Sequence, residues 1–328
     1  MDWNLSNSIR NWVMATTGLG PGVGDIHYLV ANDSAYYAWL RDDLHQSDSK
    51  IHHSFADGED ALTASRNDCL LVYPGTYTVT AQTVWDKNLT HLIGMAGPRS
   101  RGAMGGTLIN CVTTTVANVV ELEGNNCQFH NVQLRNVAAN AGNLAALKLT
   151  DGVNFYAKGC HFSGQGAATQ VATAGNCAVW FYTDSGGKPW GATFVDCKIG
   201  DAGEVVRTAG SPLFFSGGSA LTPKYIEFHN CVIEGWTQTA SVATVDLSAN
   251  YCIDRYLLFK DTLFYNYYVN NAGTATEVFD NGCGTTFNAL LFNCMQQGHA
   301  AWNTTGLNYF YGNSATPSAT GGLATALT

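Results

Sequence analysis

Apolar and polar residues alternate in a short phrase that recurs six times after residue 128. The phrase has the form apolar, any, Asn or Asp, Cys, any, apolar, any, Gly or Asn, and its clearest copies span residues 228–235 and 291–298. With the Cys position as the mark, the copies fall at residues 132, 160, 197, 231, 262 and 294, at intervals of 28, 37, 34, 31 and 32 residues. Such alternation is typical of half-buried strands, and a repeat of this length indicates a solenoid.

A second apolar run lies upstream of most copies. These runs span residues 145–149, 178–182, 212–215 and 243–247, and turn residues follow three of them at 150–152, 184–187 and 216–218. No convincing helical stripe is present in the sequence after residue 70. The order strand, turn, strand, loop therefore predicts an all-β fold, a parallel β-helix with equivalent residues of successive coils about 4.8 Å apart.

The recurring Cys and Asn or Asp positions would then form two ladders. We interpret the Cys ladder as an interior column, in which a thiol acts as a small hydrophobe. We interpret the Asn or Asp ladder as turn residues that bond the local backbone. Both interpretations are structural, and the alternative for the second ladder is a catalytic role.

The first fifty residues differ from the repeats. Residues 1–24 form a predicted arm and Gly-rich link, in which Trp3 and Trp12 are candidate assembly contacts that need a place to bury. Residues 25–50 predict a strand at 26–30 and a helix that Asp33 or Ser34 caps and that runs to Leu44. We assign residues 51–300 to the β-helix and 301–328 to a C-terminal cap and tail.

Composition narrows the class of protein. Only 12% of the 328 residues are charged, glycine occurs 35 times, and the net charge is −9 with no basic run, which argues against a nucleic-acid partner. The ten cysteines include no CxxC pair and no zinc spacing, so we expect no metal and no cofactor, and free thiols fit a reducing compartment. We expect neither a secretory signal nor a membrane partner, because no basic and apolar leader and no membrane-length apolar run is present.

A family resemblance appears at residues 69–77, which read CLLVYPGTY, and continues at 92–95 (LIGM) and 107–109 (TLI). This order resembles the opening of the pectin-lyase-like superfamily. The resemblance spans roughly residues 51–300 and implies a right-handed parallel β-helix with short N-terminal helices, one of which caps the N-terminal end. We place that helix near residues 58–66, capped by Asp57. Because one fold hosts many functions, the resemblance indicates architecture and leaves activity open.

Two segments are similar to pectin methylesterases, but their catalytic residues are degenerate. Residues 143–149 stand where that family has a QAVALRV-like strand, with Asn143 and Lys148 in place of Gln and Arg. In residues 160–166, Gln165 comes one position early and Gly166 stands near the position of the family's catalytic Asp. The second catalytic motif has its nearest string at 278–281, which lacks the leading Asp. The carboxylates and amides that ester hydrolysis needs are therefore not supplied at the matching positions.

Other enzyme classes need carboxylates in defined arrangements. A calcium-dependent lyase needs clustered acids, whereas the Asn or Asp ladder is mostly neutral. A glycosidase needs two carboxylates at a set separation, and the candidates are Asp184, Asp201, Glu204 and Asp254, which we interpret as solvated loop charges. Two acids that face each other in a groove beside exposed aromatic residues would favour an enzyme.

The whole chain also resembles structural proteins of tailed phages. The shared framework appears at residues 28–31, 36–40, 66–69 and 91–95. The resemblance implies a bacteriophage virion protein, and capsid decoration, a head spike or a tailspike would all fit. We favour a non-catalytic, capsid-associated protein that is assembled in the host cytoplasm, resides in the virion, forms a homotrimer and has the major capsid protein as its partner.

The alternative is a phage tailspike or depolymerase that acts on a host surface polysaccharide. Exposed aromatic residues would stack on sugars, and the candidates for carbohydrate binding cluster near the C-terminus: Tyr265, Tyr267, Trp302 and Tyr309, together with Tyr268 and Tyr311. The competing interpretation of this cluster is an end cap that buries the last coil. Release of reducing ends from capsular polysaccharide would distinguish the enzyme from the structural protein.

Overall fold

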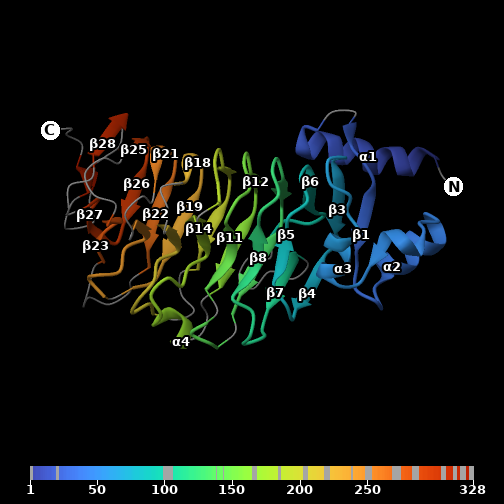
Figure 1. The fold of residues 1–328 in the computed structure, drawn as a ribbon, viewed down its shortest axis with the longest axis horizontal. Coiled ribbons are helices and arrows are strands. Elements are labelled where there is room, and N and C mark those ends of the chain that lie inside the picture. Colours follow the sequence, from blue (N-terminus) through green and yellow to red (C-terminus); the bar gives the residue numbers. More distant parts are fainter. Residues whose placement is uncertain are drawn as a thin grey trace.

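Three long, all-parallel sheets enclose one extended core in the computed structural model (Figure 1). The structure describes residues 3–19, 22–98, 106–137, 139–142, 144–164, 168–183, 186–201, 206–217, 222–237, 239–247, 253–267, 275–282, 288–303, 308–312, 316–317 and 323–324. Along most of the chain, each coil contributes one strand to each sheet, and the coils stack along the long axis. The chain is a right-handed parallel β-helix, which confirms the fold predicted from the repeat.

We name the sheets A, B and C. Sheet A contains, in spatial order, β2 (Ile51–His52), β1 (Ile26–Leu29), β3 (Asp68–Val72), β6 (Thr90–Gly94), β9 (Gln128–His130), β12 (Tyr156–Lys158), β15 (Thr193–Val195), β18 (Lys224–His229), β21 (Asp254–Lys260), β25 (Asn288–Phe292) and β28 (Asn308–Gly312). Sheet B contains β4 (Gly75–Val79), β7 (Thr107–Cys111), β10 (Gln133–Asn136), β13 (His161–Gly164), β16 (Lys198–Gly200), β19 (Val232–Gly235), β22 (Leu263–Asn266) and β26 (Met295–Gln297).

Sheet C completes each coil. It contains β5 (Thr83–Trp85), β8 (Asn118–Leu122), β11 (Ala145–Leu149), β14 (Val179–Thr183), β17 (Leu213–Gly217), β20 (Val245–Leu247) and β24 (Phe279–Asn281). Two small additional sheets pair β23 (Ala275–Glu277) with β27 (His299–Ala301) and β29 (Thr316–Pro317) with β30 (Leu323–Ala324). Because β28 joins sheet A, that sheet extends past residue 300.

The corner between sheets A and B is made by the Asn or Asp of the repeated phrase. Its residues have positive φ angles near 50°, the left-handed conformation that Asn and Asp tolerate better than most residues: Asn131, Asp196, Asn230, Asp261 and Asn293. Gly159, with φ +63°, takes the same place in one coil. The turn role is confirmed. Side-chain bonds at these corners also run between coils, because stacking brings successive corner side chains within reach: the Nδ2 of Asn293 donates to the Oδ1 of Asp261 at 2.7 Å.

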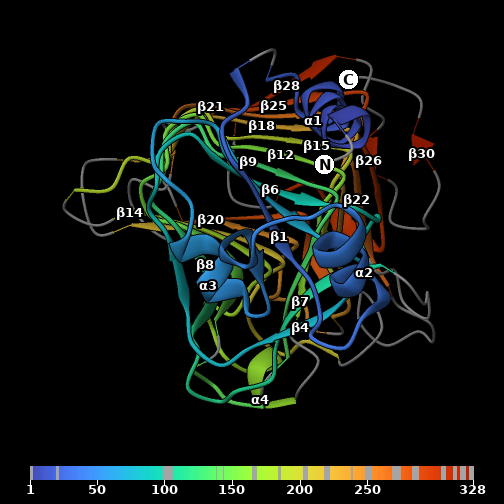
Figure 2. The same ribbon diagram turned by 90° about the vertical axis from the view of Figure 1, so that its right-hand side faces the viewer.

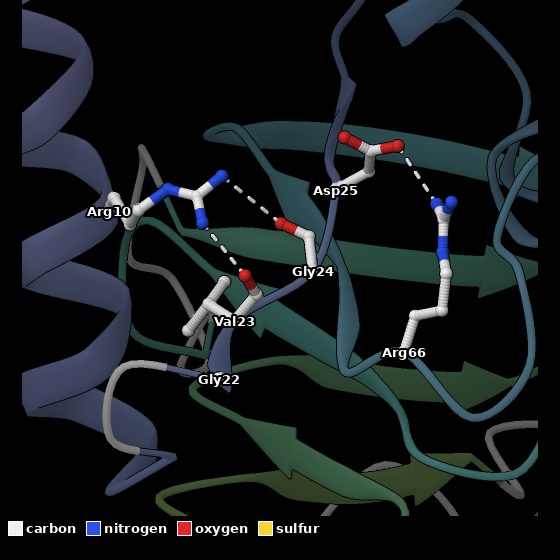
Figure 3. Close-up of a pocket in the computed structure, with 6 residues that line it drawn as sticks. All are labelled: Arg10, Gly22, Val23, Gly24, Asp25 and Arg66. Carbon is white, nitrogen blue, oxygen red and sulfur yellow. Dashed lines mark hydrogen bonds and ion pairs between the residues drawn. The ribbon is translucent and has the colours of Figure 1, made fainter.

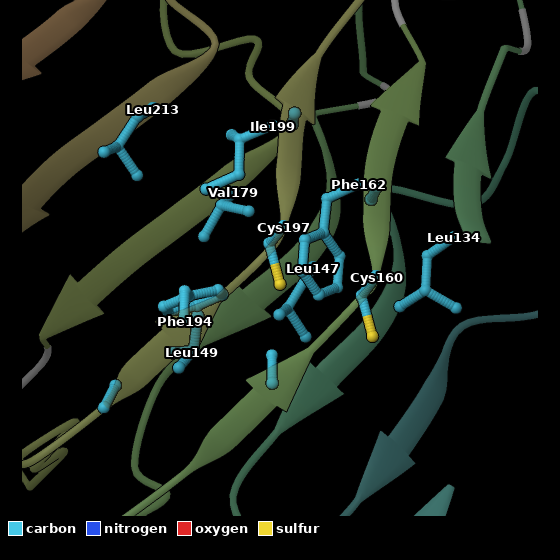
Figure 4. Close-up of a cluster of buried hydrophobic side chains, with 14 of the residues drawn as sticks. Leu134, Leu147, Leu149, Cys160, Phe162, Val179, Phe194, Cys197, Ile199 and Leu213 are labelled. Atoms are coloured by element: carbon cyan, nitrogen blue, oxygen red, sulfur yellow. The ribbon is translucent and has the colours of Figure 1, made fainter. Parts of the chain in front are cut away.

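The Cys position of the phrase faces the core. Figure 4 shows Cys160 and Cys197 among Phe162, Phe194 and several Leu and Val side chains. All eight cysteines within the described ranges are free and buried. Beside them, aromatic rings stack from coil to coil, with centroids 4.9 Å apart for Phe194 and Phe228 and again for Phe228 and Phe259. Each such ring contributes about 1.5 to 3 kcal/mol of hydrophobic stabilisation.

A short helix, α3 (Phe55–Asp60), covers the N-terminal end of the core (Figure 2). The ring of Phe55 stacks on Trp85, with centroids 6.1 Å apart, so the helix plugs the first coil as the family resemblance implied. The predicted position of the helix was wrong. The hydroxyl of Ser54 accepts a hydrogen bond from the backbone N–H of Asp57, so Ser54 is the cap and Asp57 lies in the first turn.

The predicted arm is a helix, α1 (Trp3–Thr17), that packs on the protein's own body. Ile9 and Val13 join a second apolar cluster on the outer face of sheet A, and Trp12 packs against it half-buried. The side chain of Trp3 lies outside the described part of the chain. The helix expected after Asp33 or Ser34 is capped by Ser34 and consists of α2 (Ala35–Ala38) and the π-helical η2 (Trp39–Asp43). Two further helices in the described ranges are η3 (Asp48–Lys50) and α4 (Ala168–Val171). No helix in the described ranges has the length and apolarity needed to cross a membrane.

Candidate functional site

The outer face of sheet C carries a row of charged and aromatic side chains in register. Glu121, Lys148 and Trp180 follow one another on β8, β11 and β14. The Nζ of Lys148 lies 2.7 Å from the Oε1 of Glu121 and 5.2 Å from the centroid of the Trp180 ring. Thr150 and Gln82 also donate hydrogen bonds to Glu121. Burial alone would raise the pKa of Glu121, but these bonds and the Lys148 charge together lower it, so the carboxylate stays ionised.

The charged and aromatic groups of this row already bond to neighbouring side chains on the same face of sheet C. One neighbour of the Trp180 ring is the Lys148 ammonium and another is Phe214, whose ring centroid lies 5.8 Å away, and the Trp180 indole N–H donates to Ser216 at 2.8 Å. Glu121 accepts three hydrogen bonds. The strand that resembles the pectin methylesterase segment therefore presents a closed ladder, in which Lys148 is a bridge between a carboxylate and aromatic rings.

Of the carboxylates proposed from the sequence, the structure describes Asp201, which directly follows β16, and Asp254 at the start of β21. Asp254 pairs with Lys224 at 3.0 Å, whereas Asp184 and Glu204 lie outside the described residues. A different pair, missed in the sequence, is in register on the outer face of sheet C: Asp246 on β20 and Asp280 on β24. Their aromatic neighbour in the row, Phe214, is only 8% exposed. The signal that could have found this pair is the outward position that the two Asp residues share in successive repeats.

The aromatic residues near the C-terminus take different positions. Trp302 is 3% exposed and packs on Phe264 and Phe279 in the last described part of the core, so its ring offers no face to a sugar. Tyr265 and Tyr267 are half-buried at the end of sheet B, with ring centroids 6.2 Å apart. The side chains of Tyr309 and Tyr311 on β28, and all of Tyr268, lie outside the described residues. Carbohydrate binding by the tyrosines stays a prediction.

An apolar pocket lies beside the plugged end of the solenoid. It has a volume of 420 Å³ and is lined by side chains of α1, α2, η2, the residue after β3 and the residue after β6: Ile9, Ala35, Tyr36, Trp39, Tyr73 and Met95. Tyr36 is 42% exposed, and its ring centroid lies 5.0 Å from that of Tyr73. The lining is thus almost wholly apolar and partly open to solvent, so an apolar side chain of another molecule would fit it.

A second pocket, of 470 Å³, lies between α1 and the start of β1 (Figure 3). The guanidinium of Arg10 donates to the carbonyls of Val23 and Gly24 at 2.8 and 3.3 Å, and Arg66 pairs with Asp25 at 2.8 Å. The pairing with Lys50 and Arg66 lowers the pKa of Asp25. Both arginines are thus engaged in holding the Gly-rich link against α1 and β1, which is a structural role for this pocket.

A third, polar cleft separates the C-terminal end of α1 from sheet A. Its volume is 360 Å³, and its lining comes from residues 15–18 of the helix region and from side chains of β9 and β12: Gln128, His130, Tyr156 and Lys158. The parallel register sets Tyr156 beside Gln128 and Lys158 beside His130. His130 is 1% exposed, and burial, with the nearby Lys158, lowers its pKa to about 4.

The fold and these surfaces define a protein with a right-handed parallel β-helix. No protein-family model and no curated protein sequence matches the chain. Among solved structures it is similar to pectin methylesterase PemA from Erwinia chrysanthemi, with 12% identity, a TM-score of 0.48 and coverage of 92% of this chain and 84% of that one. It is also similar to the pectin methylesterase from Yersinia enterocolitica, with 14% identity, a TM-score of 0.41 and coverage of 83% and 85%.

A viral protein is similar as well. ORF18 of Geobacillus virus E2 is 11% identical, with a TM-score of 0.36 and coverage of 78% of this chain and 58% of that one. Identities this low concern the fold and assign no activity to this chain.

Proposed function

We propose that the protein is a structural component of a bacteriophage virion, a capsid-associated decoration protein or head spike without catalytic activity. The observation that carries the proposal is the apolar pocket beside the plugged end of the solenoid. A stacked solenoid is a rigid spacer, and an apolar pocket at one end gives it a place of attachment. The sequence framework shared with structural proteins of tailed phages supports the same role.

Charge around the pocket defines the chemistry of the partner. The segment that forms its α2 and η2 wall carries Asp33, Asp42 and Asp43, and only Arg41 opposes them, paired with Asp42 at 2.7 Å. The occupant is therefore an apolar side chain of the partner protein, flanked by basic residues. A decoration role requires the major capsid protein as the partner. We propose that the protein attaches to it as a homotrimer, which is assembled in the host cytoplasm.

Copurification with mature capsids tests this function. The protein should copurify at a fixed stoichiometry, and Ala35→Asp, which places a charge at the exposed pocket wall, should abolish that association. Ala38→Asp is the matched control, because Ala38 is exposed on the same helix and does not line the pocket. Absence of the protein from purified virions would refute the role, and a monodisperse monomer in light scattering would refute the trimer.

A second candidate function is that of a tailspike or depolymerase acting on a host surface polysaccharide. The observation that favours it is the in-register pair of Asp246 and Asp280 on sheet C, since glycoside hydrolysis uses two carboxylates at a defined separation. Incubation with host capsular polysaccharide should then release reducing ends, and Asp280→Asn should stop the release. If no reducing ends appear, the structural role stands alone.

A further inference from the structure

The polar cleft between α1 and sheet A presents unpaired hydrogen-bond donors on its sheet side. The described residues give no partner to the Tyr156 hydroxyl, the Lys158 ammonium or the Gln128 amide nitrogen, and all three side chains line the cleft. Gln128 is oriented by His130, whose ring Nε2 lies 2.9 Å from the Gln128 Oε1. Because the pKa of His130 is lowered to about 4, this ring is neutral at pH 7 and donates to Gln128 from Nε2. The amide oxygen is thereby engaged, which leaves the NH₂ group to donate elsewhere.

The helix side of the cleft is formed by the last turn of α1 and the residue after it. Helix α1 ends at Thr17, and Gly18, with φ +70°, donates its backbone N–H to the carbonyl of Met14 at 2.8 Å. The carbonyls of Ala15, Thr16 and Thr17 follow in the last turn, where no further helical N–H is available to them. The C-terminal end of a helix also carries partial negative charge. Side-chain donors on the sheet, one of them a cation, thus lie across the cleft from the C-terminal end of a helix, where backbone carbonyls lack helical partners.

This arrangement selects the chemistry of a ligand. A simple anion would meet Lys158 favourably but would face the helix carbonyls, and a simple cation would face Lys158. A hydroxyl group both donates and accepts, so a ligand with several hydroxyl groups satisfies both walls at once. The half-buried ring of Tyr156 adds an aromatic surface for the apolar face of a sugar ring. We propose that the cleft binds one neutral pyranose unit of a glycan.

The proposal goes beyond attachment to the capsid, because the cleft and the apolar pocket share no lining residue. The two sites also use different forces, hydrogen bonding in the cleft and apolar contact in the pocket. A virion protein with both would hold its partner with one surface and a glycan with the other. Loss of either function leaves the other measurable.

Saturation-transfer NMR on the purified full chain tests the site. The probes are glucose, galactose, mannose, N-acetylglucosamine and N-acetylgalactosamine, with glucuronate and acetate as charged competitors. We expect at least one neutral sugar to bind. Tyr156→Phe removes one hydroxyl and keeps the ring, and Lys158→Ala removes the exposed amine, so each should weaken Kd by about tenfold, the equivalent of one lost hydrogen bond.

Lys260→Ala is the matched control. Lys260 is an exposed lysine on the same outer row of sheet A, in register with His229 through β18 and β21, and it does not line the cleft. The Lys260→Ala variant should bind the sugar with the same Kd as the unchanged protein. Three results would overturn the proposal: no neutral sugar binds, acetate displaces the sugar, or Lys158→Ala and Lys260→Ala have equal effects. Lys158 is exposed, so its variant is expected to fold even if Tyr156→Phe does not.

Discussion

The Nδ2 of Asn230 donates a hydrogen bond to the Oδ1 of Asp196 at 2.7 Å, across two successive coils. Both residues have left-handed backbones, with φ angles of 51° and 54°, at the corner between sheets A and B. One side chain therefore performs two tasks: it tolerates the corner conformation and it ties one coil to the next. This double role explains why the repeated phrase contains Asn or Asp at the corner in most coils.

Replacing Asn230 separates the two tasks. Asn230→Ala loses the inter-coil bond and puts alanine in a left-handed conformation, so it should lower the free energy of unfolding by about 1 to 2 kcal/mol. Asn230→Gly loses only the bond, because glycine adopts this φ freely, as Gly159 does in another coil. Urea denaturation of the two variants measures the difference. Equal losses would mean that backbone conformation does not govern the corner.

The interior Cys ladder should accept a residue that already occupies it in another coil. The hydroxyl of Thr262 donates to the backbone carbonyls of Phe228 and Lys260. In the preceding coil, the thiol of Cys231 makes the equivalent contacts with the backbone carbonyls of Phe194 and His229. Cys231→Thr should therefore change the free energy of unfolding by less than about 1 kcal/mol, whereas Cys231→Leu overfills the column and should cost about 1 to 3 kcal/mol. Thermal unfolding followed by circular dichroism distinguishes them. A larger loss for Thr than for Leu would contradict the packing.

The bridge between Glu121 and Lys148 should contribute to stability. Their side chains are 13% and 14% exposed, so Lys148→Met leaves a mostly buried carboxylate without its cation and should cost about 1 to 3 kcal/mol. The double variant Lys148→Met with Glu121→Gln removes both charges and should recover part of that loss. A double-mutant cycle in guanidinium chloride measures the coupling. Additive losses would show that the two groups act independently.

Acid should destabilise the fold through its buried histidines. Burial lowers the pKa of His91 and His299 to about 3, and that of His130 and His161 to about 4. The unfolded chain, with histidine pKa values of about 6.5, binds these protons first, so stability is complete above pH 6.5 and falls as the pH drops towards 4. From pH 7 to pH 5 the loss should be roughly 1 to 2 kcal/mol per histidine.

Guanidinium denaturation midpoints at the two pH values check this prediction. His161→Gln can retain the hydrogen bond to the Gly200 carbonyl, which lies 3.0 Å from the His161 Nε2, and removes one titrating group, so it should flatten the pH dependence. His45→Gln is the control, since His45 is exposed. A pH dependence unchanged by His161→Gln would place the acid sensitivity elsewhere.

The repeat predicts the β-helix because each coil must place an apolar strand residue, a left-handed corner and an interior thiol in the same order. Helix α1 escaped prediction because Ser, Asn and Thr give its sequence weak helix propensity and its first turn has no acidic residue. The apolar pair at Ile9 and Val13, four residues apart on one helix face, was the signal.

The two halves of the polar cleft differ in how far they can be predicted. The interval of 28 residues between the phrases at 132 and 160 sets Gln128 beside Tyr156 and His130 beside Lys158, as observed. The helix side comes from residues 15–18, more than a hundred positions earlier and outside the repeat. Its place depends on apolar packing against sheet A, which no spacing in the sequence encodes.

The stacking of coils also makes the length of the molecule a multiple of one fixed step. Each coil advances the chain by about 4.8 Å, which is the spacing between hydrogen-bonded strands. Helix α3 closes the end of the core at which this stacking begins. A change of one whole repeat, about 28 to 37 residues, would leave every corner and core contact of the neighbouring coils intact. Such a change would move the C-terminal end by one strand spacing relative to the plugged end. The distance between the two ends of the solenoid could therefore change in fixed steps while the sequences at both ends stay the same.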